Sequence, residues 1–482
     1  MARLVVVSNR VAMPTRGTNR AGGLEVALEE VFNKYSGIWF GWSGRVVSKE
    51  AIETKTVDAG NRQNVVTDLT EEDYREYYNG FANRVLWPIL HYRLDLAEYS
   101  RRDLSGYLRV NEHFASELHK VIEPGDVVWV HDYHLIPLAK MLRERGHQNK
   151  IGFFLHIPLP PPEILTALPN HERLFSTLTY YNLIGFQTET DSINFARYLT
   201  NELKLASRDL RVFSADGRTA VLGVFPVGVH TQEMNEWAEK AMQSAVVRRV
   251  NDSLVGRTMI IGVDRLDYSK GIVERMEAFE RFLVANPGWR EKVTYLQITP
   301  KSRSKIREYI DMERRVSATA GHINGTHGDV AWTPIRYVNQ SYGRNVLAGL
   351  YRSARVGLVT PLRDGMNLVA KEYLASQNAD DPGVLVLSRF AGAAKECEAA
   401  LLVNPYDSES VANAIVRALS MPLEERRERH KSIMRVLAGN DIKFWGEKFL
   451  TALELTYDEM TMFADMAAPS RSHMKKMRQK TA

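Results

Sequence analysis

Two cations lie five residues apart in the segment Asp264–Gly271, a loop expected between a buried strand and an amphipathic helix. The planar guanidinium of Arg265 and the ammonium group of Lys270 can both bind one diphosphate. Local ion pairs with Asp264 and Asp267 explain the same spacing equally well, because structural ion pairs are common in loops. The residues alone leave both interpretations open.

A second loop, Thr360–Glu372, combines glycine and charge after the next strand but one. The amides of Gly365 to Leu368 can meet phosphate oxygens at a helix N-terminus. Glu372 can accept from two ribose hydroxyls and Asp364 from a sugar hydroxyl. Alternatively, Asp364 caps the helix and Glu372 faces solvent. We favour ligand binding, because a loop rich in glycine and charge follows a buried strand here.

Two histidine-containing strand ends follow apolar runs in the first half of the chain. One is the segment His131–His134 and the other begins at His156. A metal site needs further converging ligands, and imidazoles at a strand end more often bond to the backbone. We therefore interpret Asp132 and His156 as groups that bind sugar hydroxyls.

Two weaker signals complete the candidate site. Gly22 and Gly23 open a helix expected over Glu25–Phe32, where they either admit an anionic ligand or form a plain turn. The aromatic segment Tyr77–Pro88 offers faces for stacking on a pyranose, although such aromatics also fill cores.

The elements that position these loops repeat a short β-branched run, a loop and an amphipathic helix, which is typical of parallel α/β sheets. The expected strands are Leu4–Ser8, Val127–His131, Ile151–Leu155 and Leu222–Val227 in a first half, and Thr258–Val263, Val293–Ile298, Val356–Thr360 and Val384–Leu387 in a second. Amphipathic helices are expected around Leu135–Leu142 and Ile272–Leu283.

The pattern predicts two Rossmann-like, doubly wound domains that face each other across a cleft. A polar helix over residues 230–249 separates the halves, so we place the boundary near residue 235, to within about 10 residues. The expected domains are residues 1–235 and 236–465, followed by a basic, disordered tail over 466–482. The last helix of the second domain is allowed to cross back to the first.

Composition narrows the function classes. Apolar residues make up 44% of the 482-residue chain and charged residues 25%, which is typical of a globular protein. The net charge of +5 comes entirely from the tail, because no acid offsets Arg471, Lys475, Lys476, Arg478 and Lys480. A neutral body argues against nucleic-acid or membrane binding. The single cysteine, Cys397, and an apolar N-terminal run too short for a signal peptide predict a cytoplasmic protein.

The chain resembles the trehalose-6-phosphate synthases, a family of retaining glycosyltransferases with the two-Rossmann (GT-B) architecture. The resemblance extends to about residue 465 and rests on many long motifs in one order. Among them are LVVVSNR, FGWSG, EYYNGFANRVLWP, HYRLD, GYLRVN, HDYHL, GFFLHIP, GFQTE, RLDYSKG, GHINGTHG and LVTPLRDGMNLVAKEY.

The resemblance implies a role for each matching position. The acceptor glucose 6-phosphate would be held by Arg10, Tyr78, Trp87, Asp132 and Arg303. The donor UDP-glucose would be bound by Gly22, Gly23, His156, Arg265, Lys270, Tyr342, Asp364, Gly365, Met366, Asn367, Leu368, Val369, Ala370, Lys371 and Glu372. The residues implied to act in catalysis are Arg265, Lys270, Asp132, His156 and Asp364.

The implied reaction moves glucose from UDP-glucose to the anomeric hydroxyl of glucose 6-phosphate with retention and releases UDP. No metal or other cofactor takes part, and the leaving phosphate oxygen accepts the acceptor's proton. Tyr342 stands where well-known bacterial members have Phe, which leaves the choice of base open. We expect a homo-oligomer, a dimer or tetramer, and a separate trehalose-6-phosphate phosphatase.

Two rival functions differ in the acceptor or in activity. A glucosylglycerol-phosphate synthase or a pseudo-sugar coupling enzyme would use another acceptor, which the set Arg10, Tyr78, Trp87 and Arg303 disfavours. A silent regulatory subunit would have lost donor residues, yet Arg265, Lys270, Asp364 and Glu372 are all present.

Overall fold

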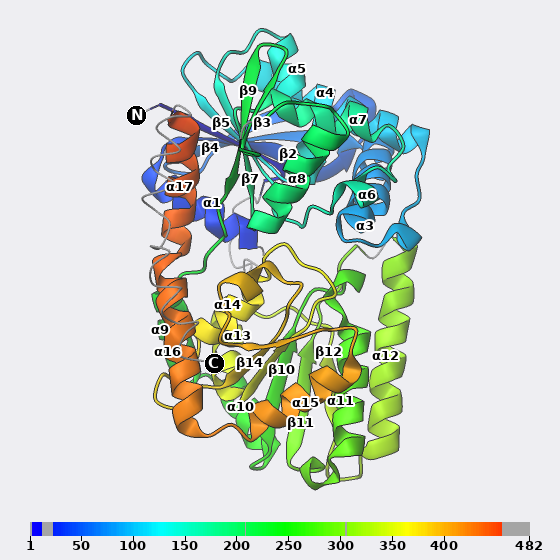
Figure 1. Ribbon diagram of the computed structural model, residues 1–482, viewed down its shortest axis with the longest axis vertical. Helices are drawn as coiled ribbons and strands as arrows, with labels where there is room; N and C mark the ends of the chain where they lie inside the picture. The colour runs from blue at the N-terminus through cyan, green and yellow to red at the C-terminus, as the bar shows by residue number, and fades with distance from the viewer. Residues whose placement is uncertain (1, 12–22, 208, 304–305, 456–482) are drawn as a thin grey trace.

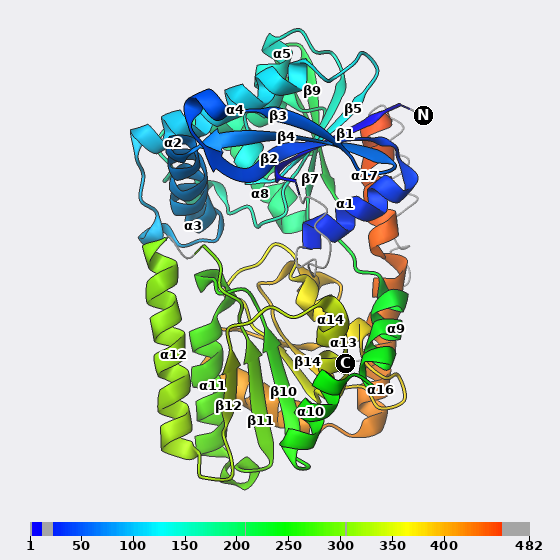
Figure 2. The same ribbon diagram turned by 180° about the vertical axis from the view of Figure 1, so that it is seen from behind.

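The structure of the protein is a computed structural model that describes residues 2–11, 23–207, 209–303 and 306–455. Two sheets lie in two separate halves, one above the other in Figure 1 and seen from behind in Figure 2. The predicted α/β class with two parallel-sheet halves is confirmed. Gly22 and the basic tail lie outside the described residues. None of the helices within these ranges combines the length and apolar character needed to cross a bilayer.

The first sheet is parallel except at its two edges, where β3 and β8 run antiparallel to their neighbours. Its order is β3 (Thr54–Asp58), β4 (Arg62–Thr70), β2 (Gly37–Val47), β1 (Leu4–Arg10), β5 (Val127–His131), β6 (Lys150–Phe154), β7 (Leu183–Phe186), β9 (Arg218–Val224), β8 (Val212–Ala215).

The second sheet is parallel throughout. Its order is β12 (Ile335–Val338), β11 (Val293–Ile298), β10 (Thr258–Val263), β13 (Val356–Val359), β14 (Val384–Ser388), β15 (Leu401–Val403).

Helices cover both faces of each sheet. Those of the first half are α1 (Gly23–Lys34), α2 (Glu71–Asp73), the π-helix η2 (Tyr74–Leu86), α3 (Trp87–Leu90), α4 (Arg101–His119), α5 (Leu138–Glu144), α6 (Pro162–Leu165), α7 (His171–Phe175) and α8 (Glu189–Asn201). The others are α9 (Thr231–Ala241), α10 (Ala245–Leu254), α11 (Ile272–Ala285), α12 (Arg307–His327), α13 (Arg344–Ser353), α14 (Leu368–Ala375), α15 (Ser408–Leu419), α16 (Leu423–Gly439) and α17 (Ile442–Glu454).

Apolar side chains point to both faces of the central strands, which explains why helices cover both faces of the sheet. In β1, Val5 and Val7 enter the core beneath α4 and α5, whereas Leu4 and Val6 enter the core beneath α1 and α17. A parallel strand buried on both faces is apolar at successive positions, as this one is.

The helix predicted over residues 230–249 is wrong, because two helices replace it. The hydroxyl of Ser244 accepts a hydrogen bond from the Val247 amide at 3.3 Å and starts α10 anew. The preceding helix, α9, packs on α13 and α14, so it lies with the second sheet.

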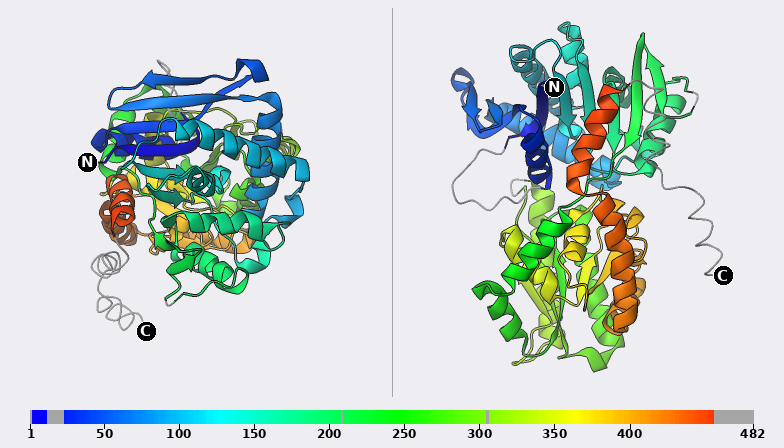
Figure 3. Two further views of the ribbon diagram at one scale, coloured as in Figure 1. Left: turned by 90° about the horizontal axis from the view of Figure 1, so that it is seen from above. Right: turned by 90° about the vertical axis from the view of Figure 1, so that its left-hand side faces the viewer.

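The last two helices connect the halves. α16 packs on α14 of the second half, and α17 continues along the side of the molecule to pack on α1, β6 and β7 of the first (Figure 3). In α17, Phe449 stacks on Trp129 of β5 with ring centroids 4.5 Å apart, and Trp445 packs on the same ring at a tilt, 4.8 Å away. The end of the described chain therefore completes the core of its beginning.

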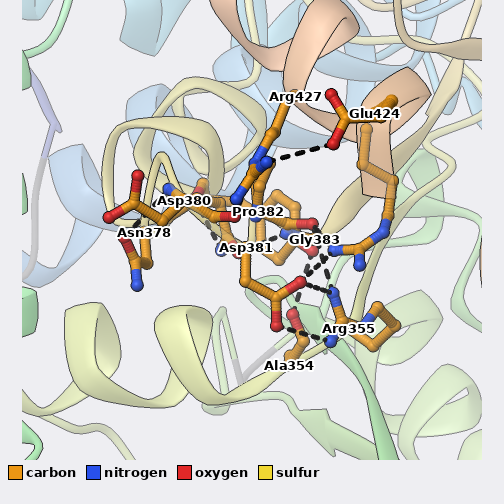
Figure 4. Close-up of polar contacts among 12 residues, drawn as sticks. Ala354, Arg355, Asn378, Asp380, Asp381, Pro382, Gly383, Glu424 and Arg427 are labelled. Carbon is orange, nitrogen blue, oxygen red and sulfur yellow. Dashed lines mark hydrogen bonds and ion pairs between the residues drawn. The ribbon is translucent and has the colours of Figure 1, made fainter. Parts of the chain in front are cut away.

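Ion pairs anchor α16 before this crossing. Asp381, in the loop after α14, accepts hydrogen bonds from Arg355 at 2.9 and 3.0 Å, as Figure 4 shows. Arg426 of α16 contacts the same carboxylate at 2.6 Å. Arg427 donates to the Asp380 carbonyl and to Glu424. Because Asp381 is half exposed, the network fixes the geometry of α16 more than it adds to stability.

Candidate active site

Loops that follow the carboxyl ends of strands in both halves meet at the junction between the halves. A methyl group added at Gly365, after β13, would lie 2.2 Å from the carbonyl oxygen of His156, after β6. Only glycine permits this approach of the two backbones. The junction therefore brings the predicted loop Thr360–Glu372 directly against a predicted sugar-binding strand end.

In the loop Asp264–Gly271 the local ion pairs considered above do not form. Asp264 pairs with the buried Arg275 at 2.7 Å, and Asp267 pairs with Arg303 at 3.3 Å. Arg265 is exposed and has no hydrogen bond or ion pair in the part of the chain that the structure describes. Lys270 reaches across to the carboxylate of Asp364. The arrangement favours the diphosphate interpretation, because both cations face the junction.

The buried Arg275 holds this loop in place. Its guanidinium donates to the carbonyl of Lys270 at 3.1 Å and to the hydroxyl of Thr360 at 2.9 Å, so it ties two loops together. We did not predict this residue. A signal was present, since helical spacing places position 275 on the apolar face of Ile272, Met276 and Phe279.

The cap of α14 is Asn367, whose side chain accepts a hydrogen bond from the Ala370 amide at 3.3 Å. The alternative that Asp364 caps this helix is therefore wrong. Asp364 instead accepts hydrogen bonds from Asn367 at 3.0 Å and from Lys270. α14 begins directly after this loop, and the first amides of an α-helix lack partners within the helix, so they are available to an anion.

Glu372 does not face solvent, since 14% of its side chain is exposed and it accepts a hydrogen bond from Arg344 at 3.0 Å. Burial raises the pKa of Glu372, and Arg344 opposes the rise. Lys371 is turned inward, where its Nζ donates to the Val227 carbonyl at 2.7 Å and pairs with Glu396. Lys371, one of the predicted donor residues, could therefore contact a ligand only through its backbone.

The remaining predicted donor residues lie around the same helix. Met366 and Ala370 are buried in the second half's core, whereas Leu368 and Val369 are partly exposed. Tyr342 lines a cavity of about 160 Å³ beneath α10. Gly23 begins α1.

The aromatic segment belongs to a π-helix, a rare element that is frequent at functional sites. Tyr78 is half-buried and stacks on Tyr74 at 5.5 Å and on His134 at 5.9 Å. Trp87, which follows the π-helix, is almost fully buried beneath the guanidinium of Arg303, 3.9 Å from its ring centroid. Arg10 lies over the ring of Trp42 at 5.7 Å. Most of this segment is therefore packed in the core, and Tyr78 is one of its few partly exposed side chains.

Asp132 has strained backbone angles, φ 74° and ψ 166°, a region that only glycine adopts freely. Its carboxylate accepts a hydrogen bond from the His156 amide at 3.3 Å. Burial raises the pKa of Asp132 to about 6, although two backbone amides, Arg303 and Arg265 oppose the rise. Strain of this kind persists where function requires one orientation.

His131 and His156 lie within hydrogen-bond distance of each other. Nδ1 of His131 lies 3.0 Å from Nε2 of His156, and burial lowers both pKa values, that of His156 to about 3. No three His, Cys, Asp or Glu side chains in the described ranges are grouped as metal ligands would be. The expectation that the reaction uses no metal stays a prediction.

Several buried polar atoms around Asp132 have no partner within the described residues. They are Nε of Arg303, Nε1 of Trp87, both ring nitrogens of His134 and Nε2 of His131. Unpaired buried donors are rare in folded proteins because each costs free energy. Their concentration beside the predicted acceptor residues indicates a polar ligand there.

Acid should destabilise the wild-type protein relative to the variant His134→Phe. Burial lowers the pKa of His134 to about 3, while the unfolded chain titrates near the ordinary value of 6.5. The free energy of unfolding therefore has its full value above pH 6.5. Below that pH it falls by about 1.4 kcal/mol per pH unit, down to about pH 3. Urea unfolding of both proteins at pH 7.5, 6 and 5 measures the difference, and parallel pH profiles would contradict the assignment.

Two facing, doubly wound sheets with charged loops at their junction define the GT-B class of glycosyltransferase. The model of glycosyltransferase family 20 matches residues 3–455. A trehalose-6-phosphate synthase of Sinorhizobium fredii is 54% identical over 95% of this chain and 99% of its own length. The corresponding synthase of an Enterobacter species is 48% identical over 95% and 96%. The chain belongs to glycosyltransferase family 20, which confirms the resemblance.

Solved structures agree with this assignment. A UDP-forming α,α-trehalose-phosphate synthase of Burkholderia xenovorans, in complex with glucose-6-phosphate, superposes with a TM-score of 0.91 at 45% identity and covers 94% of this chain and 100% of that chain. An Escherichia coli structure, described as bound with UDP-2-fluoro glucose, gives a TM-score of 0.90 at 44% identity, with the same coverage.

Proposed function

We propose that this chain is an α,α-trehalose-6-phosphate synthase, which transfers glucose from UDP-glucose to the anomeric hydroxyl of glucose 6-phosphate with retention and releases UDP. One observation carries the proposal. Two sets of cations meet at the junction, Arg303 on the ring of Trp87, and Arg265 with Lys270 in the adjoining loop, and together they offer positive charge to both phosphate-bearing substrates. Relatives 45% to 54% identical over almost the whole chain bear this name.

The donor side stabilises the departing diphosphate. Arg265, Lys270 and the first amides of α14 supply positive charge where the leaving group gains negative charge. Glu372 accepts from the ribose, and Tyr342 lies beside the base. Binding displaces Lys270 from Asp364, which then accepts from the glucosyl hydroxyls together with His156.

The acceptor side orients glucose 6-phosphate. Arg10 and Arg303 grip its phosphate, Tyr78 and Trp87 border the ring, and Asp132 accepts from a hydroxyl. The leaving phosphate oxygen takes the proton from the anomeric hydroxyl as the new glycosidic bond forms on the same face. Positioning of both sugars accounts for most of the acceleration, so no separate base is needed.

Other parts of the proposal concern the setting. We place the protein in the cytoplasm as a homo-oligomer, with no nucleic-acid or membrane partner and with a separate phosphatase acting on its product. The one cysteine, Cys397, is buried and its pKa is raised to about 12 by burial, so a reducing compartment suits it. The reaction proceeds without a bound metal ion.

A matrix assay tests the function. UDP-, ADP- and GDP-glucose are each supplied with glucose 6-phosphate or glycerol 3-phosphate, with and without EDTA, and nucleotide release and product mass are measured. We expect a disaccharide phosphate from UDP-glucose and glucose 6-phosphate, unchanged by EDTA. Product from glycerol 3-phosphate alone would indicate the other synthase, and no turnover with any pair would indicate a silent subunit.

A further inference from the structure

A buried aspartate joins the donor loop to the acceptor arginine. Asp267 is fully buried, and its Oδ1 accepts hydrogen bonds from the amide and the hydroxyl of Ser269, at 3.0 and 2.9 Å. These contacts fix the turn Tyr268–Lys270 that ends in the donor-binding lysine. Its other oxygen, Oδ2, accepts from Arg303 at 3.3 Å and from the hydroxyl of Tyr309 at 3.2 Å. One carboxylate thus holds two segments that bind different substrates.

Three hydrogen bonds and one aromatic ring hold the guanidinium of Arg303. Tyr309 and Asp267 accept from Nη1, the hydroxyl of Tyr133 accepts from Nη2 at 3.2 Å, and Trp87 lies against its face. Nε is buried and has no partner among the described residues. The arginine is therefore fixed in advance, with N–H groups at Nε and Nη2 left for an anionic ligand, and only 6% of its side chain is exposed.

The charges around Asp267 keep its carboxylate ionised. Burial would raise the pKa of Asp267, but Arg303, Arg265 and Lys270 outweigh it and bring the pKa to about 2. His91 and Tyr309 also face the carboxylate. Asp267 therefore stays ionised at neutral pH and balances a group of cations that would otherwise repel one another in the absence of substrate phosphates.

We propose that Asp267 is a positioning residue that sets Arg303 at a fixed distance from Lys270, so that the phosphate of the acceptor and the diphosphate of the donor are placed relative to each other. The inference rests on the proposed function. Its physical basis is that a misplacement of about 1 Å between reacting groups can cost on the order of 10² in rate. Tyr309, which contacts both Asp267 and Arg303, supports the same link.

The variant Asp267→Asn tests the link. The amide keeps the size and one oxygen for Ser269, but its NH₂ group opposes the Arg303 donor. We expect KM for glucose 6-phosphate to rise about tenfold and KM for UDP-glucose to change less than about threefold, because a charge-assisted hydrogen bond is lost on the acceptor side alone. With unphosphorylated glucose as the acceptor, the variant should match the wild type.

A double-mutant cycle separates positioning from general damage. In an Arg303→Ala background, adding Asp267→Asn should raise KM for glucose 6-phosphate less than about twofold further, because the two changes remove the same interaction. Tyr309→Phe should raise KM for glucose 6-phosphate about threefold and remains informative if Asp267→Asn does not fold. Asp264→Asn is the matched control, since this buried aspartate of the same loop contacts Arg275 and not Arg303.

The outcomes distinguish this inference from the proposed function. The positioning role would be overturned if Asp267→Asn lowered activity equally with glucose 6-phosphate and with glucose. It would also be overturned if the effects of Asp267→Asn and Arg303→Ala on KM were fully additive. Both outcomes would leave the synthase assignment intact. A control Asp264→Asn that shows the same selective rise in KM for glucose 6-phosphate would also overturn it. A wild-type protein that makes no product from UDP-glucose and glucose 6-phosphate would remove the proposed function itself.

Discussion

Lys270→Ala is expected to lower kcat by about two to three orders of magnitude while the protein stays folded. Removing one group that stabilises developing negative charge in an enclosed site costs about 10² to 10³ in kcat. Lys270 ends a 3₁₀ turn held by Asp267 and by Arg275, and neither contact involves its side chain. The amine should therefore contribute to turnover much more than to stability.

Steady-state kinetics with UDP-glucose and glucose 6-phosphate measure this effect, and circular dichroism checks the fold. Lys55→Ala is a suitable control, because this lysine of the edge strand β3 pairs, among the described residues, only with the neighbouring, exposed Glu53, so its loss should leave kcat unchanged. Turnover of Lys270→Ala close to that of wild type would reject the assignment of the donor loop.

Arg303→Ala is expected to raise KM for glucose 6-phosphate by about 10- to 100-fold, with a much smaller change in KM for UDP-glucose. Hydrogen bonds from a charged donor to a phosphate contribute about 1.5–3 kcal/mol, which corresponds to this range. The variant also leaves the buried Asp267 without its charged partner, which destabilises the fold. Kinetics should therefore be read at a temperature well below the unfolding midpoint.

Two further variants make the result specific. Arg303→Lys retains the charge near Asp267 but loses the planar fork, so it should keep stability and still bind the acceptor weakly. Arg307→Ala removes an arginine that is 89% exposed on α12 and should behave as wild type. An unchanged requirement for glucose 6-phosphate in Arg303→Ala would remove this residue from the acceptor site.

The sequence predicted the fold class and the buried strands well. Val127–His131, Thr258–Val263 and Val293–Ile298 have the predicted bounds, because long β-branched runs have few other conformations available. The strands that we did not predict, such as Arg62–Thr70, carry polar residues among the apolar ones, so their local pattern does not distinguish them from loops. Ser244 divided one predicted helix into two by a local cap that periodicity does not detect.

Residue types and spacing located the loops of the site but not the contacts within them. For Asp264 and Asp267 the sequence left local ion pairs open, whereas the true partners lie 11 and 36 residues further along the chain. Glu372 was placed correctly on its helix, yet its arginine partner is 28 residues earlier. Only the tertiary fold determines such pairs, and the assignment of individual residues to donor or acceptor stays a prediction.

The return of α17 to the first sheet has a consequence for biosynthesis. Trp129 and Phe154, on adjacent strands near the start of the chain, are covered by Trp445 and Phe449. On the ribosome these surfaces stay uncovered until α17 has been synthesised, so the nascent first half presents exposed aromatic side chains throughout synthesis of the second sheet. The stability of the first half therefore depends on side chains of α17 that are synthesised only after the whole second sheet.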